Sequence, residues 1–113
     1  MPQPIAEVRV ADLPVHPAED FVLLDVREDD EWRAGHIDAA VHIPMGSVPA
    51  RLAEIPVDRP IVVVCRSGGR SAQVTGFLAA AGREAVNLAG GMHAWSEAGR
   101  PMTSDGASAP SVI

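Results

Sequence analysis

The sequence has 113 residues, of which 47% are hydrophobic, and a formal net charge of −6. This length and composition suit one domain with a single core, and the acidic balance argues against a general basic surface for nucleic acid. The apolar runs are too short to cross a bilayer, and the first ten residues lack the pattern of a signal peptide. With one cysteine no internal disulfide can form. We therefore expect a cytoplasmic protein that binds neither nucleic acid nor a membrane.

The first predicted elements are two strands and a helix. An edge strand is predicted at residues 7–10. The run FVLLDV at 21–26 is apolar except for Asp25 and does not alternate, which is typical of a parallel strand that is buried on both faces. A helix is predicted over 28–35, because acidic residues favour the positive end of a helix and Gly35 favours a stop. The acidic residues 28–31 are interpreted as a solvated helix start.

The middle of the chain continues the alternation of strands and helices. A short strand is predicted at 41–43. The segment 47–55 is predicted as a helix, with Ser47 as its cap and Pro49 in its first turn. The apolar run IVVVC at 61–65 then predicts a second strand that is buried on both faces.

The second half holds the strongest helix signal, at residues 70–82. Its apolar residues recur at helical spacing, and Gly82 suits its end. This predicted buried face consists of Val74, Phe77, Leu78 and Ala81. A strand at 85–88 and a short helix at 91–99 follow. Strands that alternate with helices predict an α/β domain, with a parallel sheet flanked by helices on both faces.

The last residues differ in composition from the rest of the chain. They are small and polar and have little to bury. We therefore divide the chain into a folded domain at 5–102 and a flexible tail at 103–113.

The cysteine stands at the junction between a predicted strand and a predicted helix. Cys65 ends the strand, and the helix starts at about Arg70. Sites in open α/β sheets lie at this edge, and successive N–H groups in a glycine-rich turn can form an anion-binding nest. A hydrogen bond to a charged group contributes about 1.5–3 kcal/mol, so two or three N–H donors and an arginine would lower the pKa of the thiol. The alternative is that Cys65 is a small buried hydrophobic residue.

Three segments of the sequence resemble the rhodanese family of sulfurtransferases. CRSGGRS at 65–71 resembles the active-site loop of that family. LLDVREDDEWRAGHIDAAVHIP at 23–44 resembles its first signature, and LAGGMHAWSEAGRPM at 88–102 resembles its closing segment. Together they indicate membership more strongly than any one alone, because they occur in the family's order along nearly the whole chain.

The resemblance implies a role for each residue of the loop. Cys65 would be the nucleophile that holds sulfane sulfur as a persulfide. Asp25 and Arg27 would lie near the loop from a neighbouring strand end and organise it. The expected substrate-binding residues are Arg66, Ser67, Gly68, Gly69, Arg70 and Ser71. No cofactor is expected, and no histidine pair has metal-ligand spacing with a cysteine or carboxylate.

The implied reaction needs a sulfur donor and an external acceptor. The donor would be a small molecule, thiosulfate or a persulfide, and Arg66 and Arg70 would favour an anionic one. Because no second cysteine exists to resolve the persulfide, the acceptor would be cyanide or a thiol such as glutathione or thioredoxin.

Three other functions stay open at this point. Cysteine-dependent phosphatases and the related arsenate reductases use Cys-x5-Arg, whereas Cys65 and Arg70 here form Cys-x4-Arg, a tighter loop that suits a sulfur atom better than a phosphoryl group. A binding module without catalysis is the second alternative. Redox sensing by Cys65 through a sulfenic acid is the third.

Overall fold

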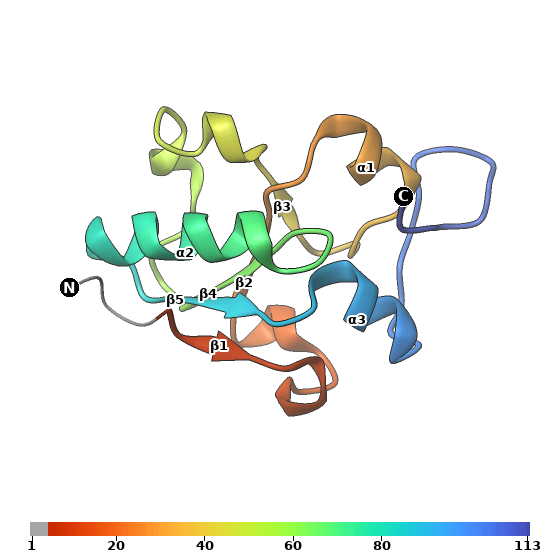
Figure 1. The fold of residues 1–113 in the computed structure, drawn as a ribbon, viewed down its shortest axis with the longest axis horizontal. Helices are drawn as coiled ribbons and strands as arrows, with labels where there is room; N and C mark the ends of the chain where they lie inside the picture. Colours follow the sequence, from red (N-terminus) through yellow and green to blue (C-terminus); the bar gives the residue numbers. More distant parts are fainter. Residues whose placement is uncertain (1–4) are drawn as a thin grey trace.

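The computed structural model describes residues 5–113, which form a five-stranded sheet in which every paired strand is parallel (Figure 1). The order across the sheet is β1-β5-β4-β2-β3. The strands are β1 (Glu7–Val8), β2 (Val22–Asp25), β3 (Val41–His42), β4 (Ile61–Val64) and β5 (Ala85–Leu88). The predicted α/β class with a parallel sheet is confirmed.

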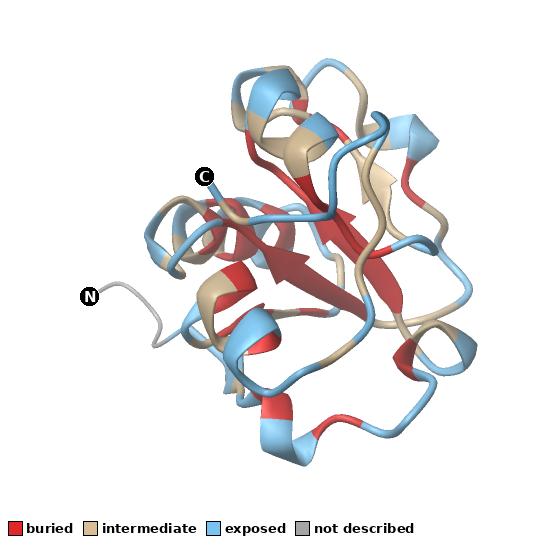
Figure 2. Cartoon of the chain, turned by 90° about the vertical axis from the view of Figure 1, so that its right-hand side faces the viewer, coloured by how far each residue is buried: buried red, intermediate tan, exposed pale blue. Residues whose placement is uncertain are grey.

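The two central strands carry the continuous apolar runs of the sequence. Every residue of β2 and β4 is buried, and these strands lie at the centre of the molecule in Figure 2. Successive side chains point to opposite faces of the sheet, so that Ile61 and Val63 join one hydrophobic cluster and Val62 and Val64 the other. A strand between two such clusters needs apolar side chains on both of its faces, which explains why these runs do not alternate.

Helices cover both faces of the sheet, as the sequence predicts. The helices are α1 (Asp29–Ala34), α2 (Gly69–Ala80) and α3 (Gly91–Glu97). Val74 and Leu78 of α2 join one cluster, and Met92 and Trp95 of α3 join the other. Helix α1 buries none of its residues. Within residues 5–113, no helix combines the length and the apolar character needed to cross a membrane.

The helix predicted at 47–55 is wrong. This part of the chain forms two separate 3₁₀ turns, η3 (Met45–Ser47) and η4 (Leu52–Glu54). Proline residues at 49 and 56 leave fewer than two turns between them, and a helix this short is marginal by itself. The apolar spacing of the segment is therefore met by tight turns that bury Val48 and Ile55.

The buried face of α2 is rotated from the predicted one. Val74 and Leu78 are buried as expected, but Phe77 is 39% exposed and Ala81 is also exposed. The other buried positions of α2 are Ser71 and Thr75. A polar pair therefore continues the apolar stripe towards the cysteine, and this hydroxyl-bearing face could not be recognised from hydrophobic spacing.

The segment 103–113 runs beside α1 and ends near it (Figure 1). Thr103 and His36 exchange two main-chain hydrogen bonds of 2.8 Å, and the amide of Ser111 donates to the carbonyl of Ala34 at 2.9 Å. Val112 packs against the cluster that contains Trp95. The contacts of this segment are therefore more extensive than its composition indicates, and its flexibility stays a prediction.

Helix α3 is docked directly on the carboxyl end of β4. The amide of Met92 donates to the carbonyl of Cys65 at 2.8 Å, and the amide of His93 donates to that of Arg66 at 3.0 Å. The first turn of a helix has amides without partners in the helix, and here two of them hold the cysteine loop. Gly91 lies between these two segments of the chain and has φ +55°.

Replacement of Gly91 by alanine should destabilise the protein. A Cβ at this position would collide with the carbonyl oxygen of Cys65 and lie 2.8 Å from the carbonyl carbon of Arg66, in a left-handed conformation. We expect Gly91→Ala to lower the free energy of unfolding by about 2 kcal/mol or more in urea titrations. Gly46→Ala is the matched control, because a Cβ at Gly46 has no neighbour within 4 Å. Equal stability of the two variants would contradict the proposed close approach.

Candidate active site

Cys65 lies at the carboxyl end of β4, on the face of the sheet that α2 covers, and it is 1% exposed. The chain then turns and enters α2 at Gly69. Gly68 has φ +107°, a conformation in which a side chain is strained. Gly69 has no such φ, and a Cβ there would meet nothing within 4 Å. The two glycines therefore differ: the turn needs the first, and the second leaves open space.

Several donors of this turn converge on the sulfur of Cys65. The amide of Gly68 donates to Sγ at 3.1 Å, and the hydroxyl of Ser71 lies 3.2 Å from the same atom. Burial raises the pKa of the Cys65 thiol. Hydrogen bonds from the Ser71 hydroxyl and from the amides of Ser71, Gly68 and Ser67 outweigh burial, so the pKa lies below its ordinary value. The site therefore favours the thiolate, which is the reactive form of cysteine.

Ser71 faces the sulfur itself. It is one of the residues expected to bind substrate, yet its side chain is fully buried. The sequence predicts that an arginine provides part of the stabilisation of the thiolate. In the structure a hydroxyl group on the first turn of α2 donates to the sulfur, and Arg70 acts on Cys65 only through its charge.

Asn87 on β5 belongs to the site and was missed in the sequence. It is 1% exposed, and its Oδ1 accepts a hydrogen bond from the hydroxyl of Ser71. Its Nδ2 donates to the carbonyl of Gly68 and to Oε2 of Glu7, both at 3.1 Å. A signal was present in the sequence, because Asn87 is a polar residue between apolar ones inside a predicted strand.

Arg70 binds a carboxylate of α1. Its Nη1 and Nη2 donate to Oε1 and Oε2 of Glu31 at 2.7 and 2.9 Å. The hydrogen bond from Arg70 is the largest influence on Glu31 and lowers the pKa of this carboxyl to about 2. Glu31 in turn raises the pKa of Arg70. Interpreting the whole acidic run as solvated was therefore wrong for Glu31, which connects α1 to the cysteine loop.

Arg66 points towards the end of the described chain. Its Nε donates to the main-chain oxygen of Ile113 at 2.9 Å. Arg66 and Arg70 therefore both belong to the loop but bind different partners. Whether they bind a donor stays a prediction.

Asp25 and Arg27 form a buried ion pair at the end of β2, the strand next to β4. Nη2 of Arg27 lies 2.8 Å from Oδ2 of Asp25 and also donates to the carbonyl of Gly35 at 2.8 Å. Arg27 is completely buried. The pair joins the end of β2 to the end of α1, and its expected role in organising the cysteine loop stays a prediction.

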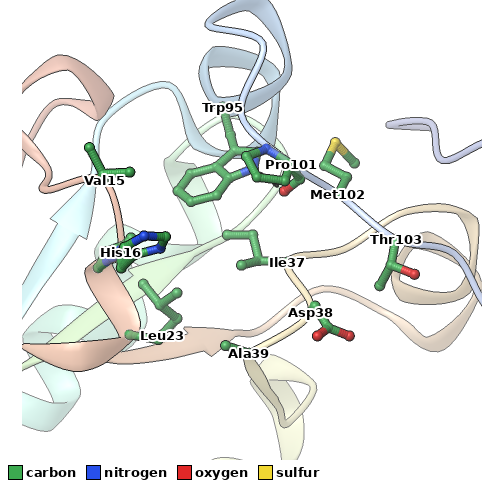
Figure 3. Close-up of a pocket in the computed structure, with 12 residues that line it drawn as sticks. Val15, His16, Leu23, Ile37, Asp38, Ala39, Trp95, Pro101, Met102 and Thr103 are labelled. Carbon is green, nitrogen blue, oxygen red and sulfur yellow. Dashed lines mark hydrogen bonds between the residues drawn. The ribbon is translucent and has the colours of Figure 1, made fainter.

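An apolar pocket of about 280 Å³ lies on the opposite face of the sheet from α2 (Figure 3). Leu23, Ile37 and Trp95 contribute to its wall, and they belong to the cluster under α3. No residue of the loop 65–71 lines it. This cavity is therefore separate from the cysteine. Among residues 5–113 no group of three His, Cys, Asp or Glu side chains is arranged to hold a metal ion.

Comparisons with known proteins agree with this fold. The family model described as "Rhodanese-like domain" matches residues 11–98. A sulfurtransferase of Allochromatium vinosum is 44% identical over 85 residues, which cover 74% of this chain and 79% of that protein. The thiosulfate sulfurtransferase GlpE of Shewanella oneidensis is 33% identical over 82 residues, or 72% of this chain and 81% of its own.

A solved structure gives the same result for the fold. A rhodanese-related protein from Thermoplasma volcanium superimposes with a TM-score of 0.81 at 31% identity, covering 87% of this chain and 97% of the other. The chain is a member of the rhodanese-like domain family.

The ion pair between Glu31 and Arg70 should make stability depend on pH. The pKa of Glu31 falls from 4.5 to about 2 on folding. The contribution of the ion pair to stability is therefore complete above the pKa of the unfolded state and is lost as the pH falls towards 2. Arg70 is about a third exposed. Allowing for solvent screening, we expect about 1–2 kcal/mol less stability at about pH 3 than at about pH 5.5 from this pair.

Urea unfolding at the two pH values measures this difference. Glu31→Gln should remove that part of the pH dependence. Glu54→Gln is the matched control, because Glu54 forms the same kind of pair with Arg51 at the surface and should have a smaller effect. An unchanged profile in Glu31→Gln would show that the pair does not stabilise the fold.

Proposed function

We propose that this protein is a sulfurtransferase in which Cys65 accepts a sulfane sulfur from a donor such as thiosulfate and passes it to cyanide or a thiol. The observation that carries the proposal is the set of hydrogen-bond donors directed at one sulfur: the amide of Gly68 at 3.1 Å and the hydroxyl of Ser71 at 3.2 Å. A thiolate at neutral pH is the nucleophile that such a transfer needs. Membership of the rhodanese-like family and the name of the Allochromatium relative support the same chemistry.

The reaction divides into two displacements at sulfur. In the first, the Cys65 thiolate attacks the outer sulfur of thiosulfate; the S–S bond of the donor breaks, and sulfite leaves with the electron pair. The product is a persulfide whose outer sulfur carries the negative charge. The amides of the loop and the first turn of α2 would stabilise this charge.

In the second step, cyanide or a thiolate attacks the outer sulfur of the persulfide. The bond between the two sulfurs breaks, and the Cys65 thiolate leaves with its electron pair and is regenerated. Glutathione and thioredoxin are the thiol acceptors we propose, because the chain has no second cysteine. We propose the cytoplasm as the compartment, since thiols are kept reduced there.

Thiosulfate as the donor is the more specific part of the proposal. The name of the Shewanella relative supports it, as do the two arginine side chains beside the loop. A dianion would be attracted by Arg66 and Arg70 against the net charge of −6 of the chain. Asp25 and Arg27 would act through the shape of the site, because both are buried.

Incubation with thiosulfate should add one sulfur atom to Cys65. We expect intact mass spectrometry to show this gain in the wild type, its loss on addition of cyanide, and no gain in Cys65→Ala, which should keep the fold. Circular dichroism of the variant checks the fold. Turnover of an aryl phosphate without sulfur transfer would instead favour the phosphatase alternative, and an unmodified Cys65 would favour a binding module.

Replacement of Arg70 should weaken the use of anionic donors. We expect Arg70→Ala to lower kcat/KM for thiosulfate about tenfold, as for loss of one charge-assisted hydrogen bond, and to lower it much less for a neutral trisulfide. Glu31→Gln is the matched control, since it also breaks the ion pair but keeps the arginine. Equal losses with both donors, or equal losses in the two variants, would contradict a charge role for Arg70.

A further inference from the structure

The hydroxyl of Ser71 has two acceptors and one hydrogen. Its Oγ lies 3.2 Å from Sγ of Cys65 and 2.5 Å from Oδ1 of Asn87. A serine hydroxyl donates one hydrogen bond at a time. The sulfur and the amide oxygen therefore cannot both be satisfied by Ser71 at the same moment.

The orientation of the Asn87 amide is determined by its other neighbours. Its nitrogen faces the carbonyl oxygen of Gly68 and a carboxylate oxygen of Glu7, each at 3.1 Å. Both of these atoms are acceptors, so the reversed amide would bring three oxygens together. Oδ1 must consequently face Ser71. Glu7 is the register partner of Asn87 across the sheet, which fixes the pair in place.

We propose that Asn87 is a positioning residue that competes with Cys65 for the hydroxyl hydrogen of Ser71. In the thiol form, the S–H group donates to Oγ of Ser71, and the hydroxyl donates to Oδ1 of Asn87. When Cys65 loses its proton to solvent, the hydroxyl rotates and donates to the thiolate. Oδ1 of Asn87 then loses a donor that solvent does not replace, because Asn87 is 1% exposed.

The competition has a consequence for sulfur transfer, and this part rests on the proposed function. Once the persulfide forms, the negative charge lies on the outer sulfur, and the inner sulfur becomes a weak acceptor. The hydroxyl of Ser71 then returns to Asn87. The donor at Ser71 therefore supports the thiolate before the attack on the sulfur donor and is withdrawn once the S–S bond of that donor has broken and the persulfide has formed.

The residues that carry the other charged groups near the site are kept in every variant compared. Glu7 of β1 reaches the site through Asn87. Arg70 of α2 acts on Cys65 through its charge and is paired with Glu31 of α1. The buried pair of Asp25 and Arg27 lies at the end of β2. These groups influence the ionisation of Cys65 equally with and without the Ser71 hydroxyl. A comparison of variants with and without this hydroxyl therefore isolates the competition.

A double-mutant cycle tests the proposal without any sulfur donor. The rate of alkylation of Cys65 by iodoacetamide is measured against pH in the wild type, Ser71→Ala, Asn87→Ala and the double variant. Ser71→Ala should slow alkylation at mildly acidic pH in both backgrounds. We expect the loss to be several-fold larger in the Asn87→Ala background, where the hydroxyl has no second acceptor.

The sign of the coupling between Ser71 and Asn87 in this cycle shows whether Asn87 competes with Cys65 for the hydroxyl hydrogen. Loss of the hydrogen bond from Asn87 to Gly68 occurs in both variants that lack Asn87, so it cancels in the cycle. A Ser71→Ala loss that is equal or smaller in the Asn87→Ala background would overturn the competition. A smaller loss would show instead that Asn87 directs the hydroxyl towards the sulfur.

A second measurement leaves Asn87 intact and serves if its variants fail to fold. The ¹³C shift of the Asn87 side-chain carbonyl is followed by NMR over the pH range in which Cys65 is alkylated. We expect it to change in step with the ionisation of Cys65 in the wild type and to stay constant in Ser71→Ala. A shift that is independent of pH in the wild type would overturn the proposal. Both experiments report on the free thiol, so they remain valid if the protein fails to transfer sulfur.

Discussion

The turn from β4 into α2 is the feature on which the site depends. The first amides of a helix lack partners inside the helix, and here the sulfur of Cys65 accepts from this turn at its start. Gly68 makes the turn possible through its positive φ, and Gly91 allows α3 to approach the same stretch of main chain. The backbone therefore supplies much of the polar environment of a sulfur that stands at the end of an apolar strand.

The loop is held from two sides by elements far apart in the sequence. On one side, Asn87 of β5 binds the carbonyl of Gly68. On the other, Glu31 of α1 binds the guanidinium group of Arg70. Both contacts also alter the chemistry of the loop. Asn87 accepts a hydrogen bond from the hydroxyl beside the sulfur, and Glu31 partly neutralises the positive charge of Arg70. Stability and reactivity are thus coupled through the same contacts.

Much of the fold was predictable because the local signals were strong. The runs at 21–26 and 61–65 are apolar enough for strands between two layers, and the residues after Cys65 combine a glycine turn with a helix start. The weaker signals failed. The spacing of Val48, Leu52 and Ile55 favours a helix, but the nearby prolines leave room only for 3₁₀ turns. Phe77 has the hydrophobicity of a core residue, yet the rotation of α2 leaves it exposed.

The sequence by itself determined the class of fold and the family, and it indicated Cys65 as the candidate nucleophile, because these follow from local patterns and from motifs along the chain. Tertiary structure alone decided which side chains meet the loop. Glu31 lies 39 residues from its partner Arg70, and Glu7 lies 80 residues from Asn87. Such contacts arise because parallel strands bring their ends to one edge of the sheet, and no local pattern specifies which distant side chain will lie opposite.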